Sequence, residues 1–170
     1  MIGAICVLGF VTVERVAELV LARRNTVRLV QRGAREAASA HYPLIVAVHA
    51  TWLCGLWLLA WDRPIRPVWL ALFVAAQMLR FWVLATLKER WTTRILVLPG
   101  APLVRTGPYR YLNHPNYVVV VAEIAILPLV FGLAWYALAF SILNAFVLSI
   151  RVTAENAALR GASNIPDSRR

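Results

Sequence analysis

The feature that most limits the fold of this chain is a predominantly apolar run from Val118 to Ile150. As one straight helix this run would be roughly 50 Å long, because an α-helix rises about 1.5 Å per residue. The hydrocarbon core of a bilayer is only about 30 Å thick, so a single crossing does not accommodate the run. Pro128 and Gly132 lie inside it and disfavour a continuous helix. We therefore expect two helices that form a hairpin.

Three further apolar blocks, at residues 2–22, 43–61 and 68–87, are close to the length of about 20 residues that a transmembrane helix needs. Hydrophobic residues make up 61% of the chain and charged residues 15%, whereas soluble domains have roughly 45–50% and 25%. We expect an all-α fold, a polytopic membrane helix bundle of about five transmembrane segments. It forms a single domain, with three N-terminal helices in residues 1–87 and a loop, a helical hairpin and a C-terminal helix in residues 88–170.

The basic residues predict the orientation of this bundle. Of the 18 Lys and Arg residues, fourteen fall within residues 23–35, 88–110 and 151–170, whereas the loop on the opposite side has only Arg63 and Arg66. Under the positive-inside rule, this asymmetry places the N-terminus outside and the C-terminus in the cytoplasm. The net charge of +10 does not predict nucleic-acid binding, because the charges separate apolar blocks.

The segment from Lys88 to Tyr117 is rich in residues that break helices. Its breakers are Pro99-Gly100, Pro102, Gly107-Pro108 and His114-Pro115. Together with its aromatic residues and arginines, they predict a structured cap at the cytoplasmic interface. One interpretation is an interfacial turn with aromatic anchors. The other is a cofactor pocket, because a residue before proline is biased to extended backbone and leaves polar groups free for a ligand.

Arg151 and Glu155 lie four residues apart where the last helix is expected to leave the membrane. They share one face of a helix, and a solvated pair of this kind contributes only about 0.2–0.5 kcal/mol. The functional interpretation separates their roles. Glu155 binds the amino end of a cofactor, and Arg151 contacts an anionic group of the substrate.

Several ionisable residues fall inside the apolar blocks. Glu14, Arg15 and Glu18 lie near the end of the first block, where they either snorkel to the interface or face a cavity. Glu123 lies deeper in the fourth segment, either protonated and bonded within its helix or part of a polar cavity. His49 is interpreted as a satisfied core histidine.

Other classes of site lack support in the sequence. His41, His49 and His114 do not have the spacing of metal ligands, so we expect no metal. The chain contains no GxGxxG, GxxxxGK[ST] or GxSxG pattern, and its two cysteines form no disulfide framework. A Rossmann-type methyltransferase of the soluble kind is therefore not predicted.

The stretch Ala101-Pro-Leu-Val-Arg-Thr-Gly-Pro-Tyr-Arg-Tyr-Leu-Asn-His-Pro-Asn-Tyr117, followed by a hydrophobic hairpin and Arg151-Val-Thr-Ala-Glu155, resembles the isoprenylcysteine carboxyl methyltransferase family of integral membrane enzymes. The resemblance implies S-adenosylmethionine (SAM) as cofactor, bound in the cytoplasmic cap. It also implies that Arg151 contacts the substrate. The implied cofactor-binding residues are Ala101, Pro102, Leu103, Val104, Tyr109, His114, Pro115, Asn116, Tyr117 and Glu155.

The N-terminal half is similar to a bacterial branch of this family, through Ala22-Arg-Arg-Asn25, Arg32-Gly33-Ala34, His41-Tyr-Pro43 and Trp91-Thr-Thr-Arg-Ile-Leu. This branch is associated with O-methylation of phenolic or pyrone hydroxyls on alkyl lipids. The resemblance therefore implies an O-methyltransferase of the bacterial inner membrane whose partners are a lipophilic small molecule and membrane lipid. The alternatives are a prenylcysteine carboxyl methyltransferase, a NAD(P)H-dependent lipid reductase and a non-enzymatic membrane subunit.

Overall fold

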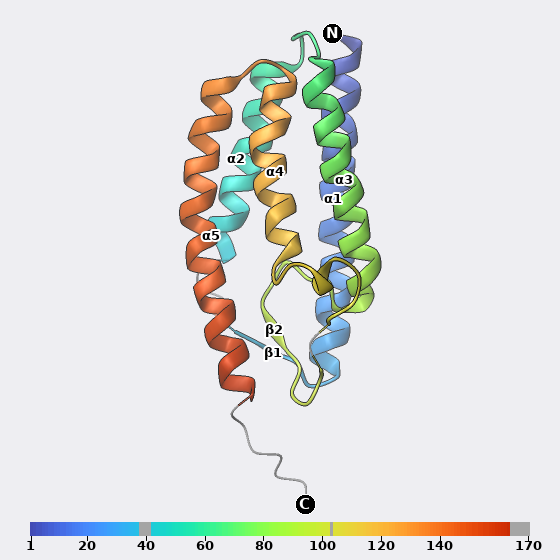
Figure 1. Cartoon of the computed structure of the whole chain (residues 1–170), viewed down its shortest axis with the longest axis vertical. Coiled ribbons are helices and arrows are strands. Elements are labelled where there is room, and N and C mark those ends of the chain that lie inside the picture. The colour runs from blue at the N-terminus through green and yellow to red at the C-terminus, as the bar shows by residue number, and fades with distance from the viewer. Residues whose placement is uncertain (38–41, 103, 164–170) are drawn as a thin grey trace, which may run out of the picture.

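The computed structural model describes residues 1–37, 42–102 and 104–163. Within these residues, long helices run side by side along the length of the molecule (Figure 1). They are α1 (Ile2–Gln31), α2 (Tyr42–Ala60), α3 (Pro67–Leu87), α4 (Pro115–Val130) and α5 (Ala134–Ser163). The N-terminus, the α2–α3 loop and the α4–α5 turn lie at one end of the bundle. The predicted helical bundle is confirmed.

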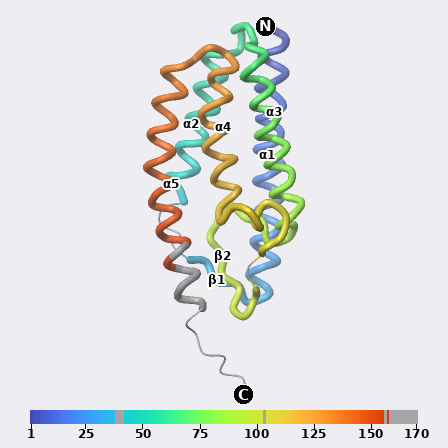
Figure 2. Tube along the Cα trace, viewed as in Figure 1, coloured from blue at the N-terminus to red at the C-terminus, as the bar shows by residue number. Residues whose placement is uncertain are grey.

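Short elements form the opposite end, where the Cα trace turns back several times (Figure 2). They are β1 (Arg35–Glu36), the 3₁₀ turns η2 (Lys88–Arg90) and η3 (Gly107–Arg110), and β2 (Leu96–Val97). The two strands pair antiparallel, with Arg35 opposite Val97 and Glu36 opposite Leu96. The sequence analysis did not anticipate this pairing, which ties the loop after α1 to the loop after α3.

The break in the long apolar run is confirmed. Helix α4 ends at Val130 and α5 begins at Ala134. Gly132 between them has a φ of +75°, and a Cβ built there would lie 2.8 Å from the Arg66 guanidinium, so the turn requires glycine. Pro128 lies within the last turn of α4 rather than at the break itself.

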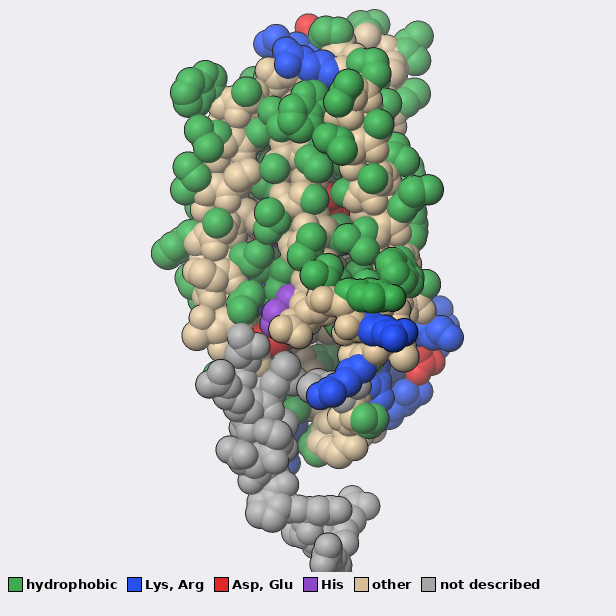
Figure 3. Space-filling view, in the orientation of Figure 1, with side chains coloured by type: hydrophobic (Ala, Val, Ile, Leu, Met, Phe, Trp, Pro, Cys, Tyr) green, Lys and Arg blue, Asp and Glu red, His purple; other side chains and the backbone are tan. Residues whose placement is uncertain are grey.

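The surface of the bundle is suited to lipid. Figure 3 shows hydrophobic side chains covering the helices over most of their length. Trp135, for example, is 84% exposed. Large exposed apolar areas of this kind are rare on soluble monomers. The segments Tyr42–Ala60, Pro67–Arg90 and Ala134–Glu155 are each long and apolar enough to cross a membrane, whereas the apolar helix α4 has only 16 residues. The chain is therefore an integral membrane protein.

Helix α1 extends beyond the first apolar block of the sequence. The apolar block stops at Ala22, but α1 continues to Gln31. Ala22, Asn25 and Leu29 are all buried, and their spacing of three and four residues keeps one stripe of the helix against the bundle. Packing of this amphipathic stripe, rather than overall hydrophobicity, sets the length of α1.

Arg80 of α3 is 3% exposed and joins three helices. Its Nε donates to Glu123 of α4 at 2.7 Å, and its Nη2 donates to the second oxygen of the same carboxylate. Its Nη1 donates to both oxygens of Glu18 of α1, at 2.8 and 3.0 Å. Arg15 also donates to Glu18 at 2.7 Å and to Glu123 at 2.6 Å. The two carboxylates are thus shared between two guanidinium groups.

These contacts decide between the interpretations of the intramembrane charges. Glu14 and Glu18 are buried, which excludes snorkelling of these two side chains to the interface. Glu123 is ion-paired with Arg15 and Arg80 rather than bonded within its own helix. Charged groups inside a bundle are stabilised when they are paired and hydrogen-bonded in this way.

Glu14, Arg15, Glu18, Arg80 and Glu123 form an ionic cluster inside the bundle. It lies between two apolar clusters along α1 and α3. On one side of it are Val11 of α1 and Phe73 of α3, which belong to the larger apolar cluster. On the other side are Ala22 of α1 and Val83 of α3, which pack with Trp91. The polar contacts therefore fix the relative height of α1, α3 and α4, because apolar packing alone is not directional.

Replacement of Arg80 tests this arrangement. We expect Arg80→Met to lower the free energy of unfolding in detergent by about 3–5 kcal/mol, because it leaves two buried carboxylates short of a partner. Arg94→Met is the control, since the pair of Arg94 with Glu36 is partly exposed and worth about 0–1 kcal/mol. Equal losses in the two variants would contradict a central role for Arg80.

Candidate functional site

The loop that follows α3 is anchored to α1. The buried Nδ2 of Asn25 donates to the carbonyl of Lys88 at 3.0 Å and to the carbonyl of Trp91 at 2.9 Å. Lys88 has a φ of +51°, a conformation that turns the chain sharply at the end of α3. Because one amide satisfies two backbone carbonyls, Asn25 fixes the direction in which the loop leaves the helix.

Two further contacts shape the loop. Nη1 of Arg90 donates to the carbonyl of Pro102 at 2.6 Å, which draws the middle of the loop back toward its start. Gly107 has a φ of +56°, and a Cβ built there would clash with the Thr86 hydroxyl and lie 3.2 Å from Nε1 of Trp82. The loop therefore lies directly on α3 at a position that only glycine allows.

The start of α4 carries the next part of the site. Pro115 occupies the first turn of the helix, where its missing N–H costs nothing, and His114 precedes it. The rings of His114 and Tyr117 are stacked with their centroids 5.2 Å apart. Pro115 itself is buried, so its role here is to set where α4 begins.

Arg151 and Glu155 of α5 meet on one residue of α4. The hydroxyl of Tyr117 donates to Oε2 of Glu155 and accepts a hydrogen bond of 3.0 Å from Nε of Arg151. The guanidinium carbon of Arg151 also lies 5.7 Å from the centroid of the Tyr117 ring. The two residues are therefore linked through Tyr117 in the interior of the site, which differs from the solvated helix-end pair.

Tyr109 adds a second phenol to this group. Burial raises the pKa of Tyr109 to about 12, with a smaller contribution from the negative charge of Glu155. Its hydroxyl is therefore protonated at neutral pH and is available as a hydrogen-bond donor. Tyr109 belongs to η3, so the 3₁₀ turn delivers this donor to the same region as α4 and α5.

These segments enclose a cavity of about 1400 Å³. Its lining residues come mainly from the loop after α3, the start of α4 and the C-terminal part of α5. Of the residues that the sequence singled out, those lining it are Ala101, Pro102, Val104, Tyr109, His114, Asn116, Tyr117, Arg151 and Glu155. Pro115 packs behind the cavity at the start of α4, and Leu103 lies outside the described residues. The structure thus brings together residues separated by up to 54 positions.

The cavity is more basic than the sequence analysis recognised. Its lining includes Glu155 and five arginines. These are Arg90, Arg94, Arg105, Arg110 and Arg151. The first four were interpreted as determinants of topology and as part of the structured cap, not as residues that line a cavity. Their density next to the helix breakers is the signal that could have indicated a basic cavity. Trp91 also lines the cavity and is buried, and its backbone carbonyl accepts the hydrogen bond from Asn25.

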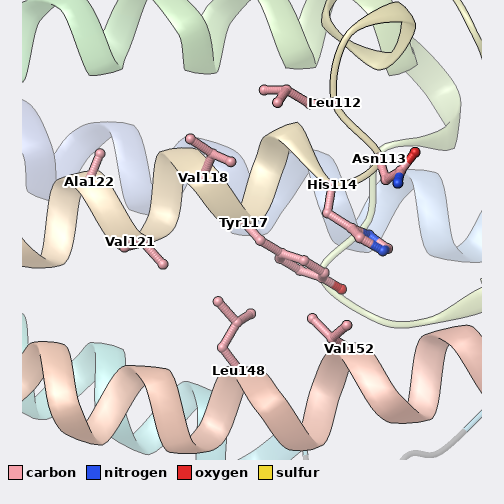
Figure 4. Close-up of a pocket in the computed structure, with 9 residues that line it drawn as sticks. All are labelled: Leu112, Asn113, His114, Tyr117, Val118, Val121, Ala122, Leu148 and Val152. Atoms are coloured by element: carbon pink, nitrogen blue, oxygen red, sulfur yellow. The ribbon is translucent and has the colours of Figure 1, made fainter.

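A second, more apolar groove of about 490 Å³ lies between α4 and α5 (Figure 4). Asn113, His114, Tyr117 and Val152 belong to both the groove and the larger cavity. The remaining lining residues are Leu112, Val118, Val121, Ala122 and Leu148. The groove therefore runs along the apolar part of the two helices and adjoins the polar cavity at His114 and Tyr117. Among the described residues, no group of three His, Cys, Asp or Glu side chains is placed to hold a metal ion.

Residues 69–161, more than half of the chain, match the isoprenylcysteine carboxyl methyltransferase family. The chain belongs to this family, which confirms the resemblance found in the sequence. Methyltransferase activity is general in the family, and its members generally use SAM.

Two bacterial proteins are similar to the chain. The uncharacterized protein YpbQ of Bacillus subtilis is 37% identical over 158 residues, which cover 90% of this chain and 94% of YpbQ. An uncharacterized protein of Haemophilus influenzae is 31% identical over 91 residues, which cover 53% of each chain. No solved structure matches the chain. The similarity to YpbQ extends beyond the segment that matches the family and includes most of the N-terminal helices.

Proposed function

We propose that this protein transfers a methyl group from SAM to an oxygen atom of a lipophilic small molecule. The observation that carries the proposal is the Tyr117 hydroxyl, which joins Glu155 and Arg151 at the point where the polar cavity adjoins the apolar groove. The polar cavity on one side of Tyr117 suits a charged, water-soluble cofactor. The other side suits a lipid chain.

The side chains around the larger cavity fit SAM. Glu155 offers a carboxylate for the amino group, and the arginines of the lining offer guanidinium groups for the carboxylate. The rings of His114, Tyr117 and Tyr109 provide aromatic faces for the adenine base and the cationic sulfonium. At about 1400 Å³, the cavity exceeds the roughly 300–1,000 Å³ of most small-molecule sites. It has room for a cofactor and the reactive end of an acceptor.

The groove between α4 and α5 is the proposed route of the acceptor. Its walls are formed largely by aliphatic side chains of membrane-embedded helices, so an alkyl chain can enter from the bilayer without crossing water. A polar head attached to that chain then reaches His114 and Tyr117. We favour a phenolic or pyrone hydroxyl as the acceptor. A prenylcysteine carboxylate is the alternative.

The residues of the chain perform the positioning steps. SAM, when bound, supplies an activated methyl group on its sulfonium. Glu155 and the loop Ala101–Val104 hold the cofactor, and Arg151 binds the acceptor oxygen as an anion after its proton has left to the cytoplasmic side. Holding both reactants in one orientation accounts for much of the rate enhancement in such transfers. The aliphatic groove excludes water, which strengthens the attraction of Arg151 for the oxygen.

The proposal predicts that SAM binds and that Glu155 contributes to its affinity. Isothermal titration calorimetry in detergent should detect SAM or S-adenosylhomocysteine but not NADPH. Glu155→Ala should weaken binding by about 1.5–3 kcal/mol, the range for a hydrogen bond to a charged group. Glu89→Ala is the matched control, because Glu89 is exposed, pairs with Arg32 and does not line the cavity. Unchanged affinity in Glu155→Ala would remove this residue from the site, and NADPH binding instead of SAM binding would favour a reductase.

The proposal also assigns different roles to Arg151 and His114. In an assay of methyl transfer from labelled SAM into a bacterial lipid extract, Arg151→Ala should lose turnover and keep nearly normal SAM affinity. Arg151→Lys should not fully restore turnover, because the planar guanidinium of arginine donates hydrogen bonds in fixed directions, whereas the ammonium of lysine is a compact charge on a flexible chain. His114→Ala should instead weaken SAM binding. Loss of SAM binding in Arg151→Ala with none in His114→Ala would reverse the two roles.

We further propose five crossings of the bacterial inner membrane, with the N-terminus outside and the C-terminus in the cytoplasm. In a Cys6→Ser, Cys54→Ser background, Asp62→Cys should react with a membrane-impermeant maleimide in intact spheroplasts. Arg23→Cys should react only after the membrane is permeabilised, because the basic end of the bundle faces the cytoplasm. Labelling of both positions from the same side would contradict the five-segment topology.

A further inference from the structure

The ionic cluster inside the bundle is not balanced in charge. It contains three carboxylates, from Glu14, Glu18 and Glu123, and two guanidinium groups, from Arg15 and Arg80. If every group were ionised, the cluster would carry one excess negative charge among buried residues. An uncompensated charge in such a place is strongly destabilising. One carboxylate of the cluster therefore needs a positive charge that the two arginines do not supply.

The carboxylates differ in their partners. Glu18 and Glu123 each accept hydrogen bonds from both Arg15 and Arg80. Glu14 is held differently, because its Oε2 accepts a hydrogen bond of 2.9 Å from the amide Nε2 of Gln77. The charges of the two arginines and of Glu18 and Glu123 thus cancel. Glu14 is the third carboxylate, and no arginine is left to balance its charge.

Two buried oxygen atoms mark where the missing charge belongs. Oε1 of Glu14 and Oε1 of Gln77 are both buried without a hydrogen-bond partner. Both side chains are at least nine-tenths buried. A carboxylate oxygen and an amide oxygen are both acceptors, so these two atoms cannot satisfy each other while Glu14 is ionised. Unpaired buried acceptors are costly and need an explanation.

We propose that Glu14 is a proton-binding site within the bundle, a neutral carboxylic acid whose Oε1–H donates to Oε1 of Gln77. The side chains are then joined by two hydrogen bonds, from the acid O–H to the amide oxygen and from the amide N–H to Oε2 of Glu14. A single proton satisfies both unpaired oxygens and removes the excess charge. The same pair links α1 to α3 one turn away from the contact of Glu18 with Arg80.

The charged surroundings of Glu14 come from several helices. On α1 they are Arg15 and Glu18, on α3 Arg80 and on α4 Glu123. His49 of α2 lies within electrostatic range of both arginines. Each arginine is hydrogen-bonded to both Glu18 and Glu123, and among the hydrogen bonds of the described residues neither arginine donates to Glu14. Nε of Arg15 is buried without a hydrogen-bond partner, so Arg15 does not satisfy the free oxygen of Glu14. A metal cation is less suited than a proton, since among the described residues no three acidic, histidine or cysteine side chains are grouped to hold one.

Infrared spectroscopy of the whole protein in detergent at neutral pH tests the proposal. The wild type should show the C=O stretching band of a protonated carboxylic acid, which shifts on exchange into D₂O. Glu14→Gln should lose that band, whereas the control Glu36→Gln should keep it, because Glu36 is an ionised partner of Arg94 at the surface. Absence of the band from the wild type, or its persistence in Glu14→Gln, would overturn the proposal.

Thermal unfolding supplies a second readout that does not depend on the spectrum. Glu14→Gln mimics the neutral acid and should unfold within a few degrees of the wild type, whereas Glu123→Gln should unfold at a clearly lower temperature. Failure of Glu14→Gln to fold, or a loss as large as that of Glu123→Gln, would mean that Glu14 is ionised. A higher unfolding temperature of the wild type in Na⁺ than in N-methylglucamine, with no such difference in Glu14→Gln, would indicate that Glu14 binds a metal cation instead of a proton. That result would also overturn the proposal.

Discussion

The rest of this structure depends on the two ion pairs, here called the Arg80 fork, that the Arg80 guanidinium makes with Glu18 and Glu123. Within a lipid-facing bundle, apolar side chains gain little by leaving lipid for protein, so directional polar contacts decide how helices align. A guanidinium suits this role because its donors lie in one plane and can serve two carboxylates at once. The fork fixes α4 against α1 and α3, and the start of α4 carries His114 and Tyr117.

The candidate site follows from that alignment. With α4 fixed, Tyr117 faces α5 and reaches Arg151 and Glu155, whereas η3 brings Tyr109 to the same carboxylate. The loop that completes the cavity is held by Asn25 of α1 and by Gly107 against α3. The helices thus position a candidate site part of which lies on an irregular loop, and loops held by a rigid scaffold often carry function. The adjoining groove between α4 and α5 gives the site a face toward lipid.

Much of this arrangement was predictable from the sequence because it depends on local patterns. Hydrophobic runs of about 20 residues indicated the helices, and Gly132 indicated the hairpin turn. The motif around Gly107 and His114 indicated the family, and the family indicated nine of the residues that line the cavity. The extension of α1 to Gln31 was missed because its charged outer face hides a buried stripe of Ala22, Asn25 and Leu29.

Apart from the local pair of Arg15 with Glu18, the partners of the buried charges were not predictable, because they are distant in sequence. Arg80 is 62 positions from Glu18 and 43 from Glu123, and Arg15 is 108 positions from Glu123. Nothing in a single sequence relates such positions. The same limit applies to the roles of Arg90 and Asn25, whose significance appears only when their carbonyl partners are known.

The central proposal is that SAM occupies the cavity between the loop after α3 and the C-terminal part of α5. Ultraviolet cross-linking of radiolabelled SAM to the detergent-solubilised protein, followed by mass spectrometry of the labelled peptides, tests it most directly. The account predicts label in peptides from residues 91–117 or 148–155, competed by unlabelled S-adenosylhomocysteine. Label confined to α1 or α2, or no label that S-adenosylhomocysteine displaces, would contradict it.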